Sequence, residues 1–236
     1  MARIASFHLV REPTWKTPVV LARLGTDRLR LPRVDGLAFW RLLGTGRGDD
    51  TGRGADLSRS AVFAVWDDED DLDRFLADHA IARRWNSAEE AWHVRLRCIG
   101  GHGRWKGIDP LAGLTAGSDD GAVAIVTRAS VRRRSWKEFD AASGVVDREL
   151  HAANGLIDVV GIGEAPIGSL ATFSLWESIR AARAFAYSMP DHVEVVRRTR
   201  SEGWYSEEMF ARFEPYGSAG TWNGRDPLDA PREPTS

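Results

Sequence analysis

The sequence predicts an α+β fold in which one ferredoxin-like unit, with the order βαββαβ, occurs twice and forms a pseudo-dimeric α+β barrel. Two observations predict it. Three short motifs recur in the same order along the two halves of the chain, which indicates an internal duplication. Within each half, hydrophobic residues also follow the periodicity of strand, helix, strand, strand, helix and strand.

The duplication rests on three pairs of segments. Two pairs are 117 positions apart and the third is 110 positions apart. A shared order with so little variation in spacing is not expected from chance similarity. The pairs are 42–46 with 159–163, 63–66 with 173–176, and 103–111 with 220–228.

The change of spacing predicts two insertions. The first half is expected to carry seven additional residues around the polar stretch 49–54, which is typical of a loop. The second half is expected to carry seven additional residues between Phe185 and Met209. This second insertion surrounds His192.

The individual elements follow from period and composition. Strands are expected where β-branched and aromatic residues alternate, and helices where apolar residues return every three to four positions. In the first half the elements are a strand at 4–10, a short helix or loop, strands at 39–44 and 61–66, a helix at 69–77 and a strand at 92–98. In the second half they are a strand at 122–129, a helix at 135–150, strands at 156–162 and 170–176, a helix at 179–187 and a strand at 209–213.

The expected organisation is a first ferredoxin-like half at 1–118 and a second half at 119–228, with an extra helix around His192. Residues 229–236 are rich in proline and charge, which predicts a disordered tail. The sheets of two such units are expected to pack face to face and to enclose a pocket.

Composition excludes several classes of function. The formal net charge is −2, with 32 basic and 34 acidic residues, so no strong field attracts nucleic acid. Cys98 is the only cysteine, which excludes an intrachain disulfide, and its place on the apolar face of a strand predicts an inert buried thiol. The sequence shows no signal peptide and no apolar run near about 18 residues. We therefore expect a cytoplasmic protein, and a peripheral membrane contact stays open.

Common catalytic and binding motifs are absent from the sequence. The glycine segments 44–49 and 161–166 lack the last glycine of a dinucleotide fingerprint, and there is no Gly-x-Ser-x-Gly elbow. His8, His93 and His102 have no partner at the spacing of a zinc site, and His102 is expected in a glycine turn. The two tryptophan turns occur once per half and are expected to be structural.

The second insertion contains the leading candidate for a metal ligand. Asp191 and Glu194 form a capping-box pattern, which predicts a helix that begins near His192. At helical spacing, His192 shares one stripe with Val196 and Thr199, so its imidazole is expected to face an apolar space. The helix dipole at this end disfavours the imidazolium form and leaves a nitrogen free to bind metal. A haem or metal ligand and a structural histidine are both compatible with this pattern.

The residues that follow His192 also allow two interpretations. Arg197, Arg198 and Arg200 carry guanidinium groups that suit carboxylates such as haem propionates, or they form a solvated basic face. Arg197, Arg198 and Arg212 are the candidates for binding propionates or for gating the site. Four aromatic residues within ten positions form either core or the wall of a cofactor pocket. They are Trp204, Tyr205, Phe210 and Phe213.

Seven blocks of the sequence together resemble spheroidene monooxygenase-like proteins. The similarity runs from about residue 3 to residue 228, and the order and spacing of the blocks make it specific. The blocks are 42–48, 64–66, 127–129, 161–166, 171–176, 185–187 and 204–213.

The resemblance implies a haem-dependent monooxygenase of the carotenoid ketolase type. Such an oxidoreductase uses haem b, molecular oxygen and an electron donor such as ferredoxin on an apolar, carotenoid-like substrate. It also implies kinship with dimeric α+β barrel haem proteins, in which a histidine of the carboxy-terminal half holds the iron, a role that falls by position to His192. The expected cofactor-binding residues are His192, Val196, Arg197, Arg198, Trp204, Tyr205, Phe210 and Arg212.

Two other functions stay open at this point. One is a haem-dependent lyase of the aldoxime dehydratase type, which product analysis would distinguish. The other is a non-enzymatic barrel that binds haem or another small molecule, which predicts no turnover with any electron donor. Assembly of the chain into a homo-oligomer also stays open.

Overall fold

The computed structural model describes residues 2–46, 54–164, 169–188 and 190–229. The first half contains β1 (Ile4–Arg11), α1 (Thr17–Arg30), β2 (Leu37–Gly46), β3 (Ala55–Trp66), α2 (Glu69–Asp78), α3 (Ala80–Asn86) and β4 (Glu90–Gly103). The second half contains β5 (Val123–Val131), α4 (Trp136–His151), β6 (Leu156–Glu164), β7 (Ser169–Trp176), α5 (Ile179–Ser188), α6 (Pro190–Glu202) and β8 (Tyr205–Gly220). Short 3₁₀ turns lie at Thr14–Lys16, Leu31–Arg33 and Arg133–Ser135.

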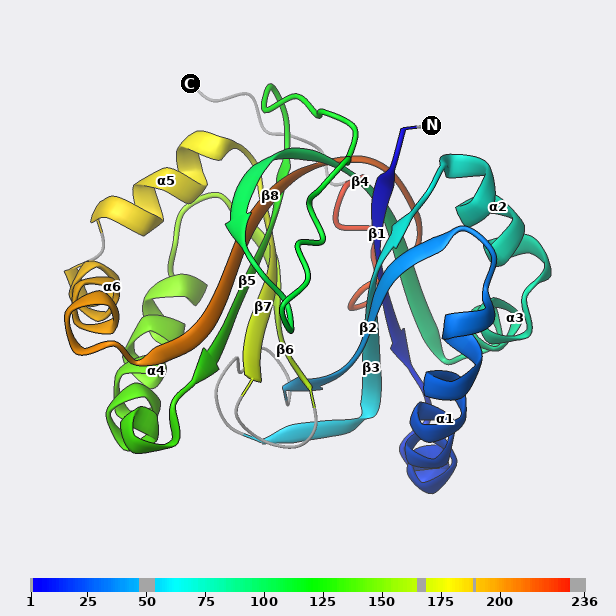
Figure 1. Ribbon diagram of the computed structural model, residues 1–236, viewed down its shortest axis with the longest axis horizontal. Helices are drawn as coiled ribbons and strands as arrows, with labels where there is room; N and C mark the ends of the chain where they lie inside the picture. The colour runs from blue at the N-terminus through cyan, green and yellow to red at the C-terminus, as the bar shows by residue number, and fades with distance from the viewer. Residues whose placement is uncertain (1, 47–53, 165–168, 189, 230–236) are drawn as a thin grey trace.

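The strands form one closed barrel in the order β1-β3-β2-β6-β7-β5-β8-β4. Each half supplies four antiparallel neighbours, and the two sheets join where β2 pairs with β6 and where β4 pairs with β8. The helices lie outside the barrel, α1 to α3 against the first sheet and α4 to α6 against the second (Figure 1). The predicted fold, a duplicated ferredoxin-like α+β barrel, is therefore confirmed.

Three elements differ from the sequence prediction. The segment predicted as a short helix or loop is the 14-residue helix α1. Its Pro18 lies in the first turn, where backbone N–H groups have no partner within the helix, so the N–H that proline lacks is not missed. The helix α3 was not predicted. The helix predicted around His192 is present as α6, and the shorter α3 occupies the matching place in the βαββαβ order of the first half. The strand predicted at 209–213 extends over 16 residues as β8.

The strand register corrects one part of the repeat. Gly44 pairs with Gly163 across the β2–β6 junction, and Leu42 and Gly161 occupy matching positions beside β3 and β7, so the equivalent residues are 119 positions apart. The predicted spacing of 117 was wrong because glycine recurs every second residue in these segments. A shift by two residues keeps every side chain on the same face of a strand, so the sequence pattern alone does not reveal it.

Aromatic side chains fill the interior of the barrel. The rings of Phe7 and Phe173 stack with centroids 3.9 Å apart, and Phe63 and Phe213 lie beside them. All four side chains are fully buried. The pocket predicted between the two sheets is therefore wrong, because these rings occupy the space where the sheets face each other.

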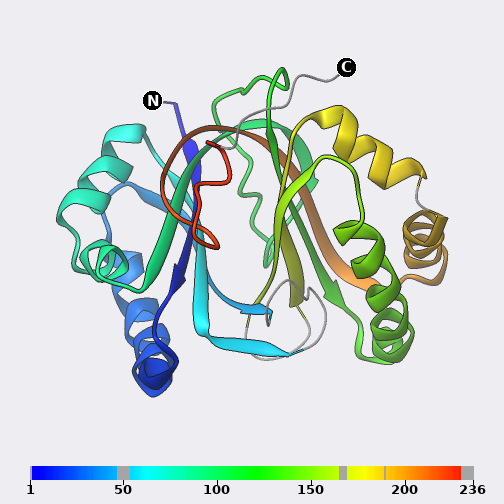
Figure 2. The same ribbon diagram turned by 180° about the vertical axis from the view of Figure 1, so that it is seen from behind.

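Each tryptophan turn is held by a carboxylate from the other half of the chain. Glu207 of β8 accepts hydrogen bonds from the backbone N–H groups of Lys106 and Gly107, both at 2.7 Å, and Glu90 of β4 accepts one from Gly224 at 2.7 Å. The turns place Trp105 and Trp222 in the barrel core. Figure 2 shows the carboxy-terminal turn beside the strands of the first half. The predicted structural role of these turns is confirmed.

None of the helices in the described ranges combines the length and the apolarity that crossing a bilayer requires. The predicted tail at 229–236 lies outside the described residues except for Asp229.

Candidate functional site

The helix-facing surface of the first sheet is closed by stacked rings. His8 of β1 and His93 of β4 lie side by side, with their Nδ1 atoms 3.0 Å apart, and the Trp85 ring stacks on His8 at 4.9 Å between centroids. His8 also hydrogen-bonds Ser6 Oγ at 2.9 Å, and Ser6 Oγ accepts a hydrogen bond from Trp66 Nε1 at 2.9 Å. These contacts cover β1 and β4 in the middle of the first sheet, and a small hollow lies beside them between α1 and β3, lined by Val62, Leu42 and Trp85.

Burial keeps both imidazoles neutral. Desolvation, followed by the neighbouring His93 and Arg95, holds the pKa of His8 well below its usual range, and desolvation lowers the pKa of His93 to about 4. In the unfolded chain both rings titrate near about 6.5. Between these values the unfolded state binds more protons than the folded state, so stability is present above about 6.5 and is lost as the pH falls towards 4.

We expect the free energy of unfolding to fall by up to about 3 kcal/mol on account of His93 alone as the pH drops from 7.5 to 4. Urea denaturation at several pH values measures this loss. The control is a variant with His8→Thr and His93→Phe, which carries the residues of the matching second-half positions. It should lose less stability over the same range, and equal slopes for the two proteins would contradict the interpretation.

The matching surface of the second sheet is open. In register, the row of His8 and His93 corresponds to Thr127 of β5 and Phe210 of β8, followed by Thr172 and Gly161 on the neighbouring strands. Thr127 is exposed although β5 lies between β7 and β8 in the sheet. An interior strand whose helix-facing side is covered is normally buried. Solvent therefore reaches the second sheet at the place where the first sheet is sealed.

Apolar side chains surround this open place. Ile125 lies two residues from Thr127 on the same face of β5 and is 9% exposed. Phe185 of α5 is also 9% exposed and belongs to the same apolar cluster, which Phe210 contacts from β8. The exposed Thr127 and the half-buried Thr172 thus form the floor, with apolar side chains beside it.

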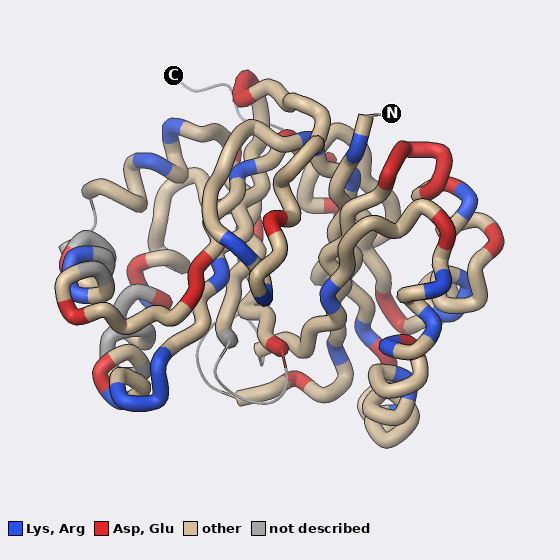
Figure 3. The backbone as a smooth tube through the Cα atoms, viewed as in Figure 1, with Lys and Arg blue, Asp and Glu red and all other residues tan. Residues whose placement is uncertain are grey.

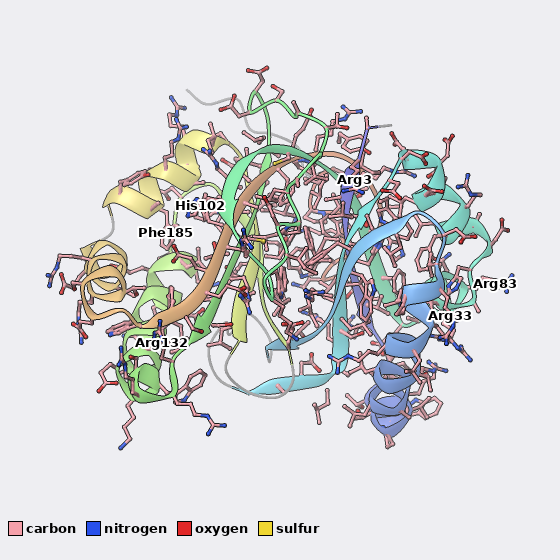
Figure 4. All side chains as sticks on the ribbon, viewed as in Figure 1. Arg3, Arg33, Arg83, His102, Arg132 and Phe185 are labelled. Carbon is pink, nitrogen blue, oxygen red and sulfur yellow. The ribbon has the colours of Figure 1, made fainter. Side chains whose placement is uncertain are left out.

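His102 extends the same row from the first half of the chain. It lies in β4, pairs with Phe210, and its ring is 6.0 Å from the Phe210 ring between centroids. Figure 4 shows His102 and Phe185 on the side of the barrel that carries α5 and α6. The predicted glycine turn is wrong, because the neighbouring glycines belong to the strand. A Cβ atom at Gly101 would lie 2.4 Å from the backbone oxygen of Phe210, so glycine allows β8 to approach.

Of the three arginines predicted to bind the cofactor, Arg212 lies on the helix-facing side of the second sheet. It pairs with Ile125 and Gly100, one row from Thr127 and Phe210. Its Nε atom is buried and has no hydrogen-bond partner among the described residues. A buried guanidinium N–H without a partner is costly, so this group is suited to an anion such as a carboxylate.

The structure places Arg197 and Arg198 on the solvent side of α6. Arg197 binds Glu194 through two hydrogen bonds of 2.8 and 2.6 Å, and Arg198 binds Glu202 at 2.9 Å. The Arg198 guanidinium also lies over the Trp204 ring, 4.8 Å from its centroid. The charges of both arginines are therefore already paired within the helix, as the solvated-face interpretation expects.

Trp204 and Tyr205 lie where α6 meets β8 and contact α4. Their rings pack edge to face on Phe139, at 6.4 and 6.0 Å between centroids. Trp204 is 1% exposed and donates a hydrogen bond to Glu202 at 2.8 Å. Burial raises the pKa of Tyr205, which keeps its phenol protonated. These two aromatic residues hold α4 and α6 together, whereas Phe210 faces the open row.

His192 and Val196 belong to α6, which lies against α4 and α5 on the helical side of the second sheet. Their side chains lie outside the described part of the structure. The proposed contact of His192 with a metal therefore stays a prediction.

The described residues contain no group of three or more histidine, cysteine, aspartate or glutamate side chains arranged to hold a metal ion. Cys98 lies beside the barrel core and is partly buried, and burial raises the pKa of its thiol. A protonated thiol is a poor nucleophile and a poor metal ligand.

Solved structures share this fold. An aldoxime dehydratase in complex with butyraldoxime superposes with a TM-score of 0.60 and 10% identity, over 91% of this chain and 79% of that chain. A second aldoxime dehydratase gives a TM-score of 0.54 and 11% identity, over 90% of this chain and 81% of that chain. At these identities the likeness shows the fold alone. No family model matches the chain.

Three curated relatives are spheroidene monooxygenases. The chain is 30% identical to the protein of Rhodobacter capsulatus over 229 residues, which cover 95% of both chains. It is 34% identical to that of Rubrivivax gelatinosus over 80% of this chain and 73% of the relative. It is 29% identical to that of Cereibacter sphaeroides over 89% of this chain, and the match spans 65% of the relative's length. The chain belongs to the spheroidene monooxygenase family.

Proposed function

We propose that this protein is a haem-dependent monooxygenase that oxidises an apolar, carotenoid-like substrate, with haem b held on the helix-facing side of the second sheet and His192 as the iron ligand. One observation carries the proposal. The exposed Thr127 marks an opening in the middle of the second sheet, at the position that His8, His93 and Trp85 close in the first sheet.

The residues around the opening fit a haem group. Haem b is a flat, largely apolar ring that carries two carboxylates. The small side chains of Thr127 and Thr172 leave a level floor, Ile125 and Phe210 supply apolar contact, and Arg212 offers a buried N–H without a partner to a carboxylate. The helix α6, which carries His192, lies on the same side of the sheet.

The bound haem would supply the activation of molecular oxygen with electrons from a donor such as ferredoxin. The chain's own residues would position the substrate and keep water away. Phe185 and Phe210 offer apolar surface to a hydrocarbon, and the Thr127 hydroxyl can donate a hydrogen bond within the opening. His102 stands at the edge of the same row, where its imidazole can carry a proton between the site and solvent.

The names of the three relatives support the choice of reaction. All three are named spheroidene monooxygenase, and spheroidene is a carotenoid. The aldoxime dehydratases share the fold at low identity, which supports no transfer of their lyase chemistry.

The test is a haemin titration of the purified protein, followed by product analysis. We expect a saturable Soret band, and then an oxygen atom from isotope-labelled molecular oxygen in a carotenoid product when ferredoxin and its reductase are supplied. Dehydration of an aldoxime without oxygen consumption would favour a lyase instead. Haemin binding without turnover of any substrate would favour a binding protein, and no Soret band would refute the haem proposal.

A further inference from the structure

The helix α1 has an uncharged face that points away from the barrel. At 100° per residue, the buried Val20 and Leu31 mark the side that packs on the first sheet. The opposite side carries seven exposed residues without a single charge. They are Pro18, Val19, Leu21, Ala22, Gly25, Thr26 and Leu29.

Large apolar side chains are unusually exposed on and beside this face. Leu29 is 67% exposed, Leu21 is 48% exposed and Val19 is 45% exposed. Trp15, in the 3₁₀ turn directly before α1, is 77% exposed. Single exposed apolar residues are common, but a continuous set along one helix marks a surface that binds something. In Figure 1, α1 projects at the lower edge of the molecule, and its lower coils are largely tan in Figure 3.

Positive charge flanks the uncharged face on both sides. Arg28 and Arg30 lie at its opposite edges, both are exposed, and neither makes an ion pair with a described residue. Arg33 follows at the end of the helix, and its guanidinium donates a hydrogen bond to the carbonyl of Leu29. The single acidic residue of α1, Asp27, is buried and bound to Arg84 at 2.5 Å. The exposed surface of the helix therefore combines apolar residues with positive charge and no negative charge.

We propose that α1 docks this protein on an anionic lipid bilayer, with the helix parallel to the membrane plane, Trp15 and Leu29 inserted among the acyl chains, and Arg28 and Arg30 at the phosphate level. A helix with tryptophan and leucine on one side and arginine at its edges is the pattern of an interfacial helix. Its 14 residues give a length of about 21 Å, enough to lie flat in the interface.

Charge favours a bilayer over a second copy of this chain. Two copies that met through α1 would bring the same arginines together without acidic partners, which is unfavourable. The face also offers little for a specific protein contact, because the hydroxyl of Thr26 already donates to the carbonyl of Arg23 at 3.1 Å. A bilayer with anionic lipids matches both properties of this surface, since its acyl chains suit the apolar residues and its phosphates suit the arginines.

The test uses flotation with vesicles of phosphatidylcholine alone or mixed with phosphatidylglycerol. We expect the protein to float with the mixed vesicles. Replacing Trp15, Leu21 and Leu29 together with serine should lower the partition coefficient at least about tenfold, because each side chain is exposed and its apolar contact is lost. Arg28→Gln with Arg30→Gln should remove the preference for phosphatidylglycerol.

The matched control is Ile108→Ser, which removes a side chain that is 50% exposed but lies in the first tryptophan turn. It should float like the unchanged protein, and circular dichroism should show the same fold for all variants. The proposal fails if the protein does not float with either vesicle, or if the serine variant floats as well as the control. It also fails if light scattering shows a dimer that the serine variant converts to a monomer. None of these readouts requires haem, so they are independent of the proposed reaction.

Discussion

Replacing His192 with alanine is expected to weaken haemin binding by at least about 100-fold, because loss of a partner that only supports a metal ligand already costs about 10–100-fold. Among the other described candidates, His102 lies beside the opening, whereas Cys98 faces the barrel core and burial raises the pKa of its thiol. A Soret titration of the variant beside the unchanged protein measures the difference.

Two comparisons make this experiment specific. Arg197→Ala changes a residue on the same helix that is already paired with Glu194, so it should bind haemin like the unchanged protein. His192→Gly with added imidazole should regain the Soret band, because free imidazole can replace the missing ligand. If His102→Ala loses the band while His192→Ala keeps it, the ligand is His102.

Replacing Thr127 with tryptophan should close the opening without unfolding the protein. The Thr127 side chain is exposed, so an indole can occupy the space beside it without displacing the core. A bound group that meets an overpacked side chain loses about 1–3 kcal/mol, which corresponds to about five- to 150-fold in affinity. Haemin titration measures the loss, and the melting temperature reports the fold.

Thr127→Val is the matched control, because valine has nearly the same shape and leaves the opening. It should bind haemin close to normally. Equal affinity of the tryptophan variant and the valine variant would show that the bound group lies elsewhere.

The fold could be predicted from the sequence because the duplication gives two independent readings of the same unit. Each half repeats the same alternation of strands and helices, so an error in one half can be checked against the other. The sequence left α1 as a short helix or a loop because its outer face is as apolar as its inner face, and the 3.6-residue period is therefore weak. The β2–β6 register was not predicted correctly because glycine recurs every second residue in both strands, which is also the period of a strand.

The candidate site could be predicted only in part. Arg212 and Phe210 were identified from their chain neighbourhood, and both face the second sheet's open row. Thr127 and His102 were missed, because a threonine in a strand and a histidine among glycines are ordinary in sequence. Their importance comes from long-range pairing of β4, β5 and β8, which depends on barrel closure and cannot be read from local periodicity. A comparison of matched positions, His8 with Thr127, is the signal that could have found the opening.

The sealed first sheet also determines a stoichiometry. A barrel assembled from two identical units would present two equivalent openings, one over each sheet. Here the ring stack of His8, His93 and Trp85 occupies one of them, so the duplicated chain is expected to saturate at one equivalent of ligand. In a symmetric homodimer both sheets would carry the same residues. Fusion of the two units allows them to differ, so that packed rings cover one sheet while the other stays open to a ligand.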